Sequence, residues 1–205
     1  MATDYPVQYS VVRPMRFTPL QLLLRVAAFV AIGAAGTSFG ALFALAYVML
    51  PVIAASRLLV RGDPEAFVRE DGARIVTALR WTAAVCGWAG LVIDQVPLRI
   101  PDETMRLSIG GTPHPTPGGA IARIVTGLPS ALVLSLLCAI GVFVWLWAAV
   151  SIVLTRRVGP LSFEYLVGLQ RWSIRLLAYQ ASLVDAYPPF TLADSTGWDS
   201  PQVVS

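Results

Sequence analysis

Few side chains in this sequence have the types and spacing that catalysis or metal binding requires. The single histidine, His114, lies between Pro113 and Pro115, and no cysteine or carboxylate stands at ligand spacing from it. Cys86 and Cys138 lie inside apolar runs and fit neither a disulfide framework nor a metal motif, so we interpret them as small packing residues. No glycine pattern of a phosphate-binding loop occurs. We therefore expect an exposed His114 and no catalytic, cofactor-binding or metal-binding residues.

Two acids, Asp94 and Asp185, occupy equivalent places shortly before a proline, where a proton or ion relay would need them. Asp185 follows Arg171 by 14 residues, roughly 21 Å along a helix, so these two side chains cannot pair within it. We interpret both acids as polar residues that mark the exit of a helix.

The composition indicates an integral membrane protein. Of 205 residues, 56% are hydrophobic and 13% are charged, whereas soluble domains carry about 25% charged residues. All 15 basic residues are arginine and form no basic stripe, so nucleic-acid binding is not expected. The N-terminal residues lack the apolar core of a signal peptide, which leaves targeting to the first membrane helix.

Two uncharged runs, residues 26–56 and 124–154, are long enough to cross a bilayer. Each extends over about 31 residues, whereas a span needs roughly 20. Gly33, Gly36 and Gly40 place small residues near one face of the first run. They fit either close helix packing or the ordinary glycine content of membrane helices.

Alternating patterns predict short extramembrane strands. Residues 5–12 alternate apolar and polar side chains, and so do two pieces within residues 98–109, as a hairpin or as separate extended segments.

An amphipathic helix follows each long run, at residues 74–93 and 161–185. In the second helix Glu164, Arg171 and Arg175 share one narrow face. A membrane crossing would cost about 2.5–3.5 kcal/mol for each arginine near the midplane, so we favour an interfacial helix with these arginines at the headgroups. The predicted fold is a mainly α integral membrane protein with two transmembrane and two interfacial helices. A four-helix transmembrane bundle is the alternative.

The two halves of the chain repeat one order of elements. At an offset of 91 residues, Arg80-Trp81 falls on Arg171-Trp172, and at 98 residues Arg25 falls on Arg123. We predict an internal duplication, with units at residues 1–103 and 104–194 and a polar tail at 195–205. One span per unit would invert the second unit relative to the first. The arginines then divide seven against eight between the two sides, so the positive-inside rule assigns no orientation.

Lipid or partner contacts are expected on the amphipathic helices and on the proline corner after the second one. Arginine beside tryptophan suits membrane interfaces, and Arg171 and Arg175 with Glu164 either hold an anionic headgroup or form a plain polar stripe. Phe190 and Leu192 alternate with Thr191 as in a strand, and we expect Phe190 to be mostly buried. The candidate contacts are Arg80, Trp81, Arg171, Trp172, Arg175, Tyr179, Asp185, Tyr187, Pro188, Pro189 and Phe190.

A specific pattern runs through the second unit: Arg156-Arg-Val-Gly-Pro160, Phe163, Val167-Gly168, Arg171-Trp172, Arg175, Ala178-Tyr179, Leu183-Val-Asp185 and Tyr187-Pro-Pro-Phe190-Thr-Leu192. In order and spacing it resembles the DUF4389 family of bacterial membrane proteins, whose function is uncharacterised. About 35 residues match well, the opening Tyr5-Pro-Val7 is similar to the family's usual start, and the rest matches only as hydrophobic pattern. The resemblance implies a membrane architecture and a bacterial cytoplasmic membrane location, and it implies no activity.

We expect a non-enzymatic accessory or scaffold subunit that contacts the lipid bilayer and either other membrane subunits or a second copy of itself. The alternative is a small inverted-repeat transporter or a protein that binds anionic lipids. The polar residues inside the two long runs are hydroxyl and aromatic side chains that carry no charge at neutral pH, which counts against transport by two spans alone.

Overall fold

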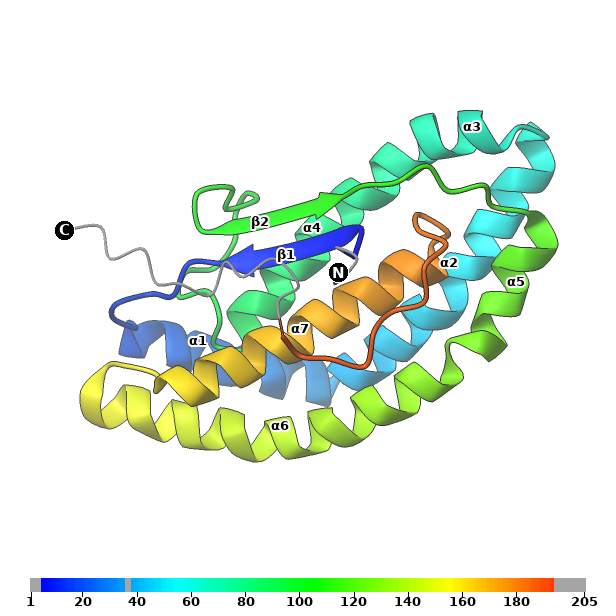
Figure 1. Cartoon of the computed structure of the whole chain (residues 1–205). Helices are drawn as coiled ribbons and strands as arrows, with labels where there is room; N and C mark the ends of the chain where they lie inside the picture. The colour runs from blue at the N-terminus through cyan, green and yellow to red at the C-terminus, as the bar shows by residue number, and fades with distance from the viewer. Residues whose placement is uncertain (1–4, 36–37, 194–205) are drawn as a thin grey trace.

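The structure, a computed structural model, describes residues 5–35 and 38–193 (Figure 1). Most of these residues are helical, and two short strands form one antiparallel sheet. The strands are β1 (Val7–Val11) and β2 (Met105–Ile109). The helices are α1 (Pro19–Ala34), α2 (Phe39–Arg61), α3 (Pro64–Ala66), the π-helix η1 (Phe67–Asp71), α4 (Gly72–Ala89), α5 (Pro117–Thr126), α6 (Leu128–Thr155) and α7 (Pro160–Gln180).

Two of the described helices, α2 and α6, are long and apolar enough to cross a membrane. They contain 23 and 28 residues. At 1.5 Å per residue the longer one extends about 42 Å, against about 30 Å for a hydrocarbon core. The prediction of a mainly helical protein with two long apolar helices and short strands is therefore confirmed.

The prediction of one continuous helix over residues 26–56 is wrong. α1 begins earlier, with Pro19 in its first turn, and ends at Ala34, whereas α2 starts anew at Phe39. Ser38 explains the restart, because its extended backbone lets the side-chain oxygen accept from the amide of Ala41 as an N-cap. A Cβ at Gly33 would meet nothing within 4 Å, so this glycine supports no close helix packing.

The second run, residues 124–154, is divided at Gly127 between α5 and α6. A Cβ at Gly127 would lie 2.8 Å from the Tyr47 hydroxyl and 2.9 Å from the Arg123 carbonyl, so only glycine fits here. Pro129 in the first turn of α6 also permits no backbone hydrogen bond to the preceding helix.

Both predicted amphipathic helices are present but end earlier than expected. The helix predicted at 74–93 is α4, which stops at Ala89, and the helix predicted at 161–185 is α7, which stops at Gln180. Leu91 and Ser182 follow with left-handed φ angles of 60° and 59°, which closes each helix end and turns the chain away.

The sheet joins segments that are distant in the sequence. β1 pairs with β2, and Tyr9 lies opposite Leu107 at the centre of the ladder. Residues 98–100 form no strand, so the hairpin alternative for residues 98–109 is wrong. The inner face of the sheet is apolar and buried, whereas the outer face carries Gln8, Ser10, Arg106 and Ser108.

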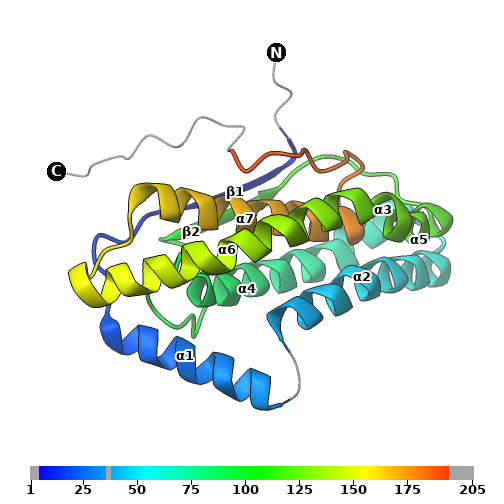
Figure 2. The ribbon, with the colours of Figure 1, turned by 90° about the horizontal axis from the view of Figure 1, so that it is seen from below.

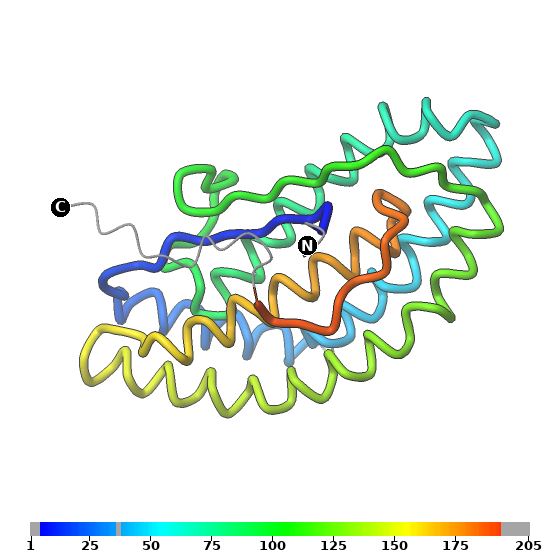
Figure 3. Tube along the Cα trace, viewed as in Figure 1, coloured from blue at the N-terminus to red at the C-terminus, as the bar shows by residue number. Residues whose placement is uncertain are grey.

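α7 forms the centre of the molecule. It lies between the sheet and the long helix α6, beside α4, and α1 lies at the periphery (Figure 2). Every residue from Leu166 to Gln180 except Ser173 is buried. The segment after α7 turns back along the helix, so the corner residues lie on it (Figure 3).

Candidate functional site: arginines at strand edges and helix ends

Arg171 and Arg175 lie on the face of α7 that meets β1. The Nε of Arg171 donates to the Tyr9 carbonyl at 3.1 Å and its Nη1 to the Leu192 carbonyl at 2.7 Å. The Nε of Arg175 faces the Val7 carbonyl at 3.4 Å, and its guanidinium lies over the Tyr5 ring. Val7 and Tyr9 belong to the edge of β1 that β2 leaves open, so the arginines satisfy carbonyls that would otherwise lack strand partners.

This arrangement overturns the predicted headgroup-facing stripe. Arg171 is 4% exposed and Arg175 is fully buried, so neither side chain reaches lipid headgroups. The helical periodicity located their shared face correctly, but a β-strand rather than the membrane surface covers that face. Gly168, on the same face, allows the approach, because a Cβ there would lie 2.7 Å from that of Leu192.

Arg80 makes the corresponding contact to the other strand. Its Nη2 donates to the carbonyl of Leu107 in β2 at 3.1 Å from a half-buried position on α4. Trp81, its neighbour, is 39% exposed on the outer surface. Trp81 therefore remains available for the predicted contact to lipid or a partner, whereas Arg80 serves the sheet.

A second pair of arginines binds the ends of helices. Arg123, from α5, donates to the carbonyls of Tyr179 and Val184 and to a carboxylate oxygen of Asp185 at 2.7 Å. Its guanidinium also stacks 4.6 Å from the Tyr179 ring. Asp185, expected as a bare helix exit, therefore pairs with Arg123, and it also accepts from the backbone amide of His114.

Arg25, from α1, makes the same set of contacts at the end of α4. It donates to the carbonyls of Trp88, Ile93 and Asp94, and its guanidinium lies 5.5 Å from the Trp88 ring. Its distance to the Asp94 carboxylate is 3.9 Å, and that carboxylate accepts from Thr18. Burial lowers the pKa of Arg25 to about 10, partly offset by Asp94, so the side chain stays charged at neutral pH.

Sequence reasoning assigned no role to Arg25 and Arg123, although it aligned them. The signal that could have found them is a Thr-Pro pair seven residues before each arginine, at Thr18 and Thr116. These threonines precede α1 and α5, and each arginine therefore sits two turns inside its helix.

The corner after α7 forms an aromatic ladder. Trp172 and Phe190 pack edge to face at 5.7 Å, Phe190 and Tyr187 lie 5.8 Å apart, and Tyr187 and Tyr179 lie 5.6 Å apart. Pro188 is buried and Pro189 is half-buried. Phe190 contacts α7 as expected, but it is 56% exposed and forms no strand, because it covers the outside of Trp172.

A polar cluster, also missed by sequence reasoning, surrounds the α5–α6 junction. The Tyr47 hydroxyl donates to the Ile124 carbonyl at 2.7 Å, and Gln180 donates to the Arg123 carbonyl at 3.0 Å. The indole of Trp172 donates to the Ser130 hydroxyl at 2.7 Å, and the Ser130 amide donates to the Tyr187 hydroxyl. These bonds fix the start of α6, where backbone amides have no partner within the helix.

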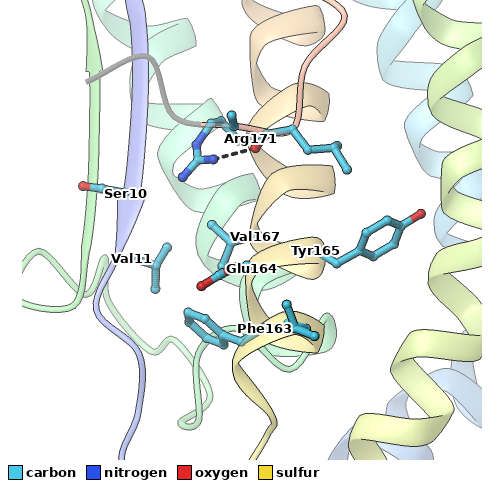
Figure 4. Close-up of a pocket in the computed structure, with 10 residues that line it drawn as sticks. Ser10, Val11, Phe163, Glu164, Tyr165, Val167 and Arg171 are labelled. Atoms are coloured by element: carbon cyan, nitrogen blue, oxygen red, sulfur yellow. Dashed lines mark hydrogen bonds between the residues drawn. The ribbon is translucent and has the colours of Figure 1, made fainter. Parts of the chain in front are cut away.

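A cavity of about 390 Å³ opens beside Arg171 (Figure 4). It lies between the end of β1 and the first half of α7, and Leu192 and Ala193 border it. Phe163 and Val167 supply apolar walls and Glu164 a carboxylate.

In the described part of the chain, no group of three or more histidine, cysteine or acidic residues could hold a metal ion. His114 is exposed, as predicted, and both cysteines are free thiols.

Comparison with known proteins gave no match among family models, curated proteins or solved structures. The resemblance to the DUF4389 family therefore stays an expectation.

Proposed function

We propose that this chain is a non-enzymatic integral membrane protein of the bacterial cytoplasmic membrane that acts as an accessory or scaffold subunit. In this proposal α2 and α6 cross the bilayer. The apolar surface of α6 supports it, since Phe143 and Trp147 are 73% and 67% exposed and the helix carries no charge. α2 and the peripheral α1 add further exposed leucine and valine side chains.

The observation that supports a role as a subunit of a larger complex is the polar outer face of the sheet. Trp172 of α7 bonds to Ser130 of α6, and the adjacent Arg171 bonds to Tyr9 of β1. Leu169 of α7 also packs against Gly141 at the middle of α6. If α6 crosses the membrane, α7 and the strand beside it therefore lie within the thickness of the membrane. The polar outer face of a sheet does not lie against hydrocarbon, so another protein surface must cover it.

We also propose that the chain is a duplication whose two units are related by a pseudo-two-fold axis. Tyr9 and Leu107 correspond at the offset of 98 residues, and they face each other at the centre of the ladder, as such an axis requires. Arg171 binds the Tyr9 carbonyl while Arg80 binds the Leu107 carbonyl, so equivalent arginines reach across to the strand of the other unit. The left-handed residues Leu91 and Ser182 also correspond, at the offset of 91.

The number of membrane crossings, two or four, depends on whether α4 and α7 also cross the bilayer. With Arg171 and Arg175 bound to strand carbonyls, the cost of an intramembrane charge that favoured an interfacial α7 is reduced. A central, covered α7 is compatible with the four-helix alternative, and the arginines offer no support for anionic-lipid binding at this face.

The test uses a photo-crosslinking amino acid at Ser108 on the outer face of the sheet, with Phe143 on the exposed face of α6 as the control. In native membranes we expect protein adducts from Ser108 and lipid adducts from Phe143. A Ser108 variant that yields only lipid adducts contradicts the subunit role. Cysteines at Leu128 and Thr155, the two ends of α6, should react from opposite sides of the membrane. Reaction from one side contradicts the crossing.

A further inference from the structure

Four exposed arginines lie at one end of the molecule. Arg13 and Arg16 belong to the connection between β1 and α1, and Arg156 and Arg157 belong to the turn between α6 and α7. These two segments lie side by side in both Figure 1 and Figure 2. A backbone hydrogen bond of 2.8 Å from the Phe17 amide to the Arg156 carbonyl joins them. The four arginines therefore share one surface, which we call the arginine end.

Of these four side chains, only that of Arg13 is used within the described part of the chain. Its guanidinium donates to the Val158 carbonyl and lies 5.8 Å from the centre of the Phe163 ring. The other three arginines make no side-chain hydrogen bond or ion pair with any residue that the structure describes. Three guanidinium groups can therefore bind an anion from outside the chain.

The charge of the arginine end is not balanced by acids. Asp94 bonds to Thr18 at the start of α1, but it also lies 3.9 Å from the buried Arg25, which offsets its charge. Glu164, in the second turn of α7, is the other acid next to these segments. One carboxylate thus faces four arginines, and the surface keeps a positive charge.

The opposite end of the molecule shows that this excess is local. Residues 57–74, around α3, contain four arginines and four acids. Arg61 pairs there with both Glu70 and Asp71. The positive charge of that region is therefore balanced within the chain.

Apolar side chains are exposed among the arginines of the arginine end. Met15 and Leu161 are 80% and 81% exposed, and the last turn of α6 exposes Val153 and Leu154. A soluble anion would contact the guanidinium groups alone. A membrane surface contacts both kinds of side chain, because the charges meet phosphates while the apolar groups enter the boundary of the acyl chains.

We propose that the arginine end binds the headgroup of an anionic phospholipid. The inference rests on the proposed function, because a membrane-crossing α6 would place its last residue, Thr155, at the level of the headgroups. Guanidinium groups donate paired hydrogen bonds to phosphate oxygens, and basic clusters directly beside a membrane helix attract anionic lipids. This surface is separate from Arg171 and Arg175, whose guanidinium groups are buried against β1.

The double variant Arg16→Gln/Arg157→Gln tests the surface in the full chain, purified in a neutral detergent. Binding of fluorescent phosphatidylglycerol should weaken about tenfold or more, since each arginine at a headgroup contributes about fivefold. The difference from the wild type should disappear at about 1 M salt, where charges are screened within about 3 Å. Arg16→Lys/Arg157→Lys should keep most of the affinity, because both charges remain.

The matched control is Arg57→Gln/Arg69→Gln, which removes two exposed arginines from the balanced end and should leave the affinity unchanged. An unchanged affinity of Arg16→Gln/Arg157→Gln, or an equal loss in the control, overturns the inference. Equal binding of phosphatidylcholine would assign the contact to the apolar side chains alone. Displacement of the lipid by an equal concentration of inorganic phosphate would assign the site to a soluble anion.

The labelling of the two ends of α6 separates this inference from the proposed function. Reaction of Leu128 and Thr155 cysteines from opposite sides, with no preference for anionic lipid, rejects the arginine end and leaves the crossing intact. Reaction from one side contradicts the crossing, whatever lipid the purified protein binds.

Discussion

Arg171 donates from its Nε to the carbonyl oxygen of Tyr9 at 3.1 Å, across 162 positions of the sequence. This bond joins the most buried helix to an open strand edge, and Leu192 receives a second bond from the same guanidinium. The planar fork of arginine suits two separate carbonyl acceptors, which a lysine ammonium would not reach together.

Replacing Arg171 should destabilise the fold more than replacing Arg80. Hydrogen bonds from charged groups contribute about 1.5–3 kcal/mol each, and Arg171→Ala breaks two of them in a buried site. Arg80→Ala breaks one bond at a half-buried site. The melting temperature in detergent should therefore fall further for Arg171→Ala than for Arg80→Ala. Arg171→Lys should lower it by an intermediate amount, because a lysine can keep only one of the two hydrogen bonds. Equal midpoints for Arg171→Ala and the wild type would show that the strand edge is satisfied in another way.

Arg123 should matter through the carbonyls that it binds rather than through its ion pair. The Asp185 carboxylate is half-exposed, so Asp185→Asn should lower the free energy of unfolding by about 1 kcal/mol or less. Arg123→Gln should cost about 2–4 kcal/mol, because the carbonyls of Tyr179 and Val184 lose a buried charged donor. Chemical denaturation of both variants measures the difference, and a larger effect of Asp185→Asn would assign the stability to the ion pair instead.

Gly127→Ala should disrupt the α5–α6 junction. The new methyl group would contact the Gln180 amide and lie 2.9 Å from the Arg123 carbonyl, which cannot move without breaking α5. We expect a loss of about 1–3 kcal/mol. Gly33→Ala is the matched control, since its methyl group meets nothing and the helix should gain about 0.5–1 kcal/mol. The order of melting temperatures, Gly33→Ala above wild type above Gly127→Ala, checks the assignment.

The aromatic corner should show unequal contributions from its two largest rings. Phe190→Ala should cost about 1 kcal/mol, because the ring is more than half exposed and loses mainly its edge contacts. Trp172→Ala should cost about 3–5 kcal/mol, because the indole is buried and also bonds to Ser130. If thermal unfolding shows a similar loss of stability for both variants, the Phe190 ring must be buried in solution by another part of the chain or by a partner.

Sequence reasoning identified the apolar helices and the shared face of Arg171 and Arg175, because periodicity and hydropathy act within one element. It missed the end of α1 and the new start of α2 at Ser38. No charged residue in the apolar run marks this boundary, which depends on the single N-cap hydrogen bond of Ser38. It also placed the two arginines at headgroups, since the alternative acceptors belong to a strand more than 160 residues away.

Sequence reasoning assigned no role to the arginines that bind helix ends, for a related reason. Arg123 lies in a chain segment far from Tyr179 and Val184, and only the left-handed turn at Ser182 brings those carbonyls together around it. Such a site consists of backbone groups, so no side-chain spacing in the sequence marks it.

Pairing of β1 with late parts of the chain sets an order of events during synthesis. β1 is synthesised before both of its partners. β2, which pairs with one edge of β1, follows after α4, and the arginines that bind the other edge of β1 emerge only with α7. Until then the nascent chain carries an unprotected strand next to apolar helices, which is a hazard for wrong pairing with other chains. Contacts of such long sequence separation also form slowly. A release of the chain before Arg171 is translated would therefore leave β1 paired with β2 along one edge, with the carbonyls of its other edge lacking their arginine partners.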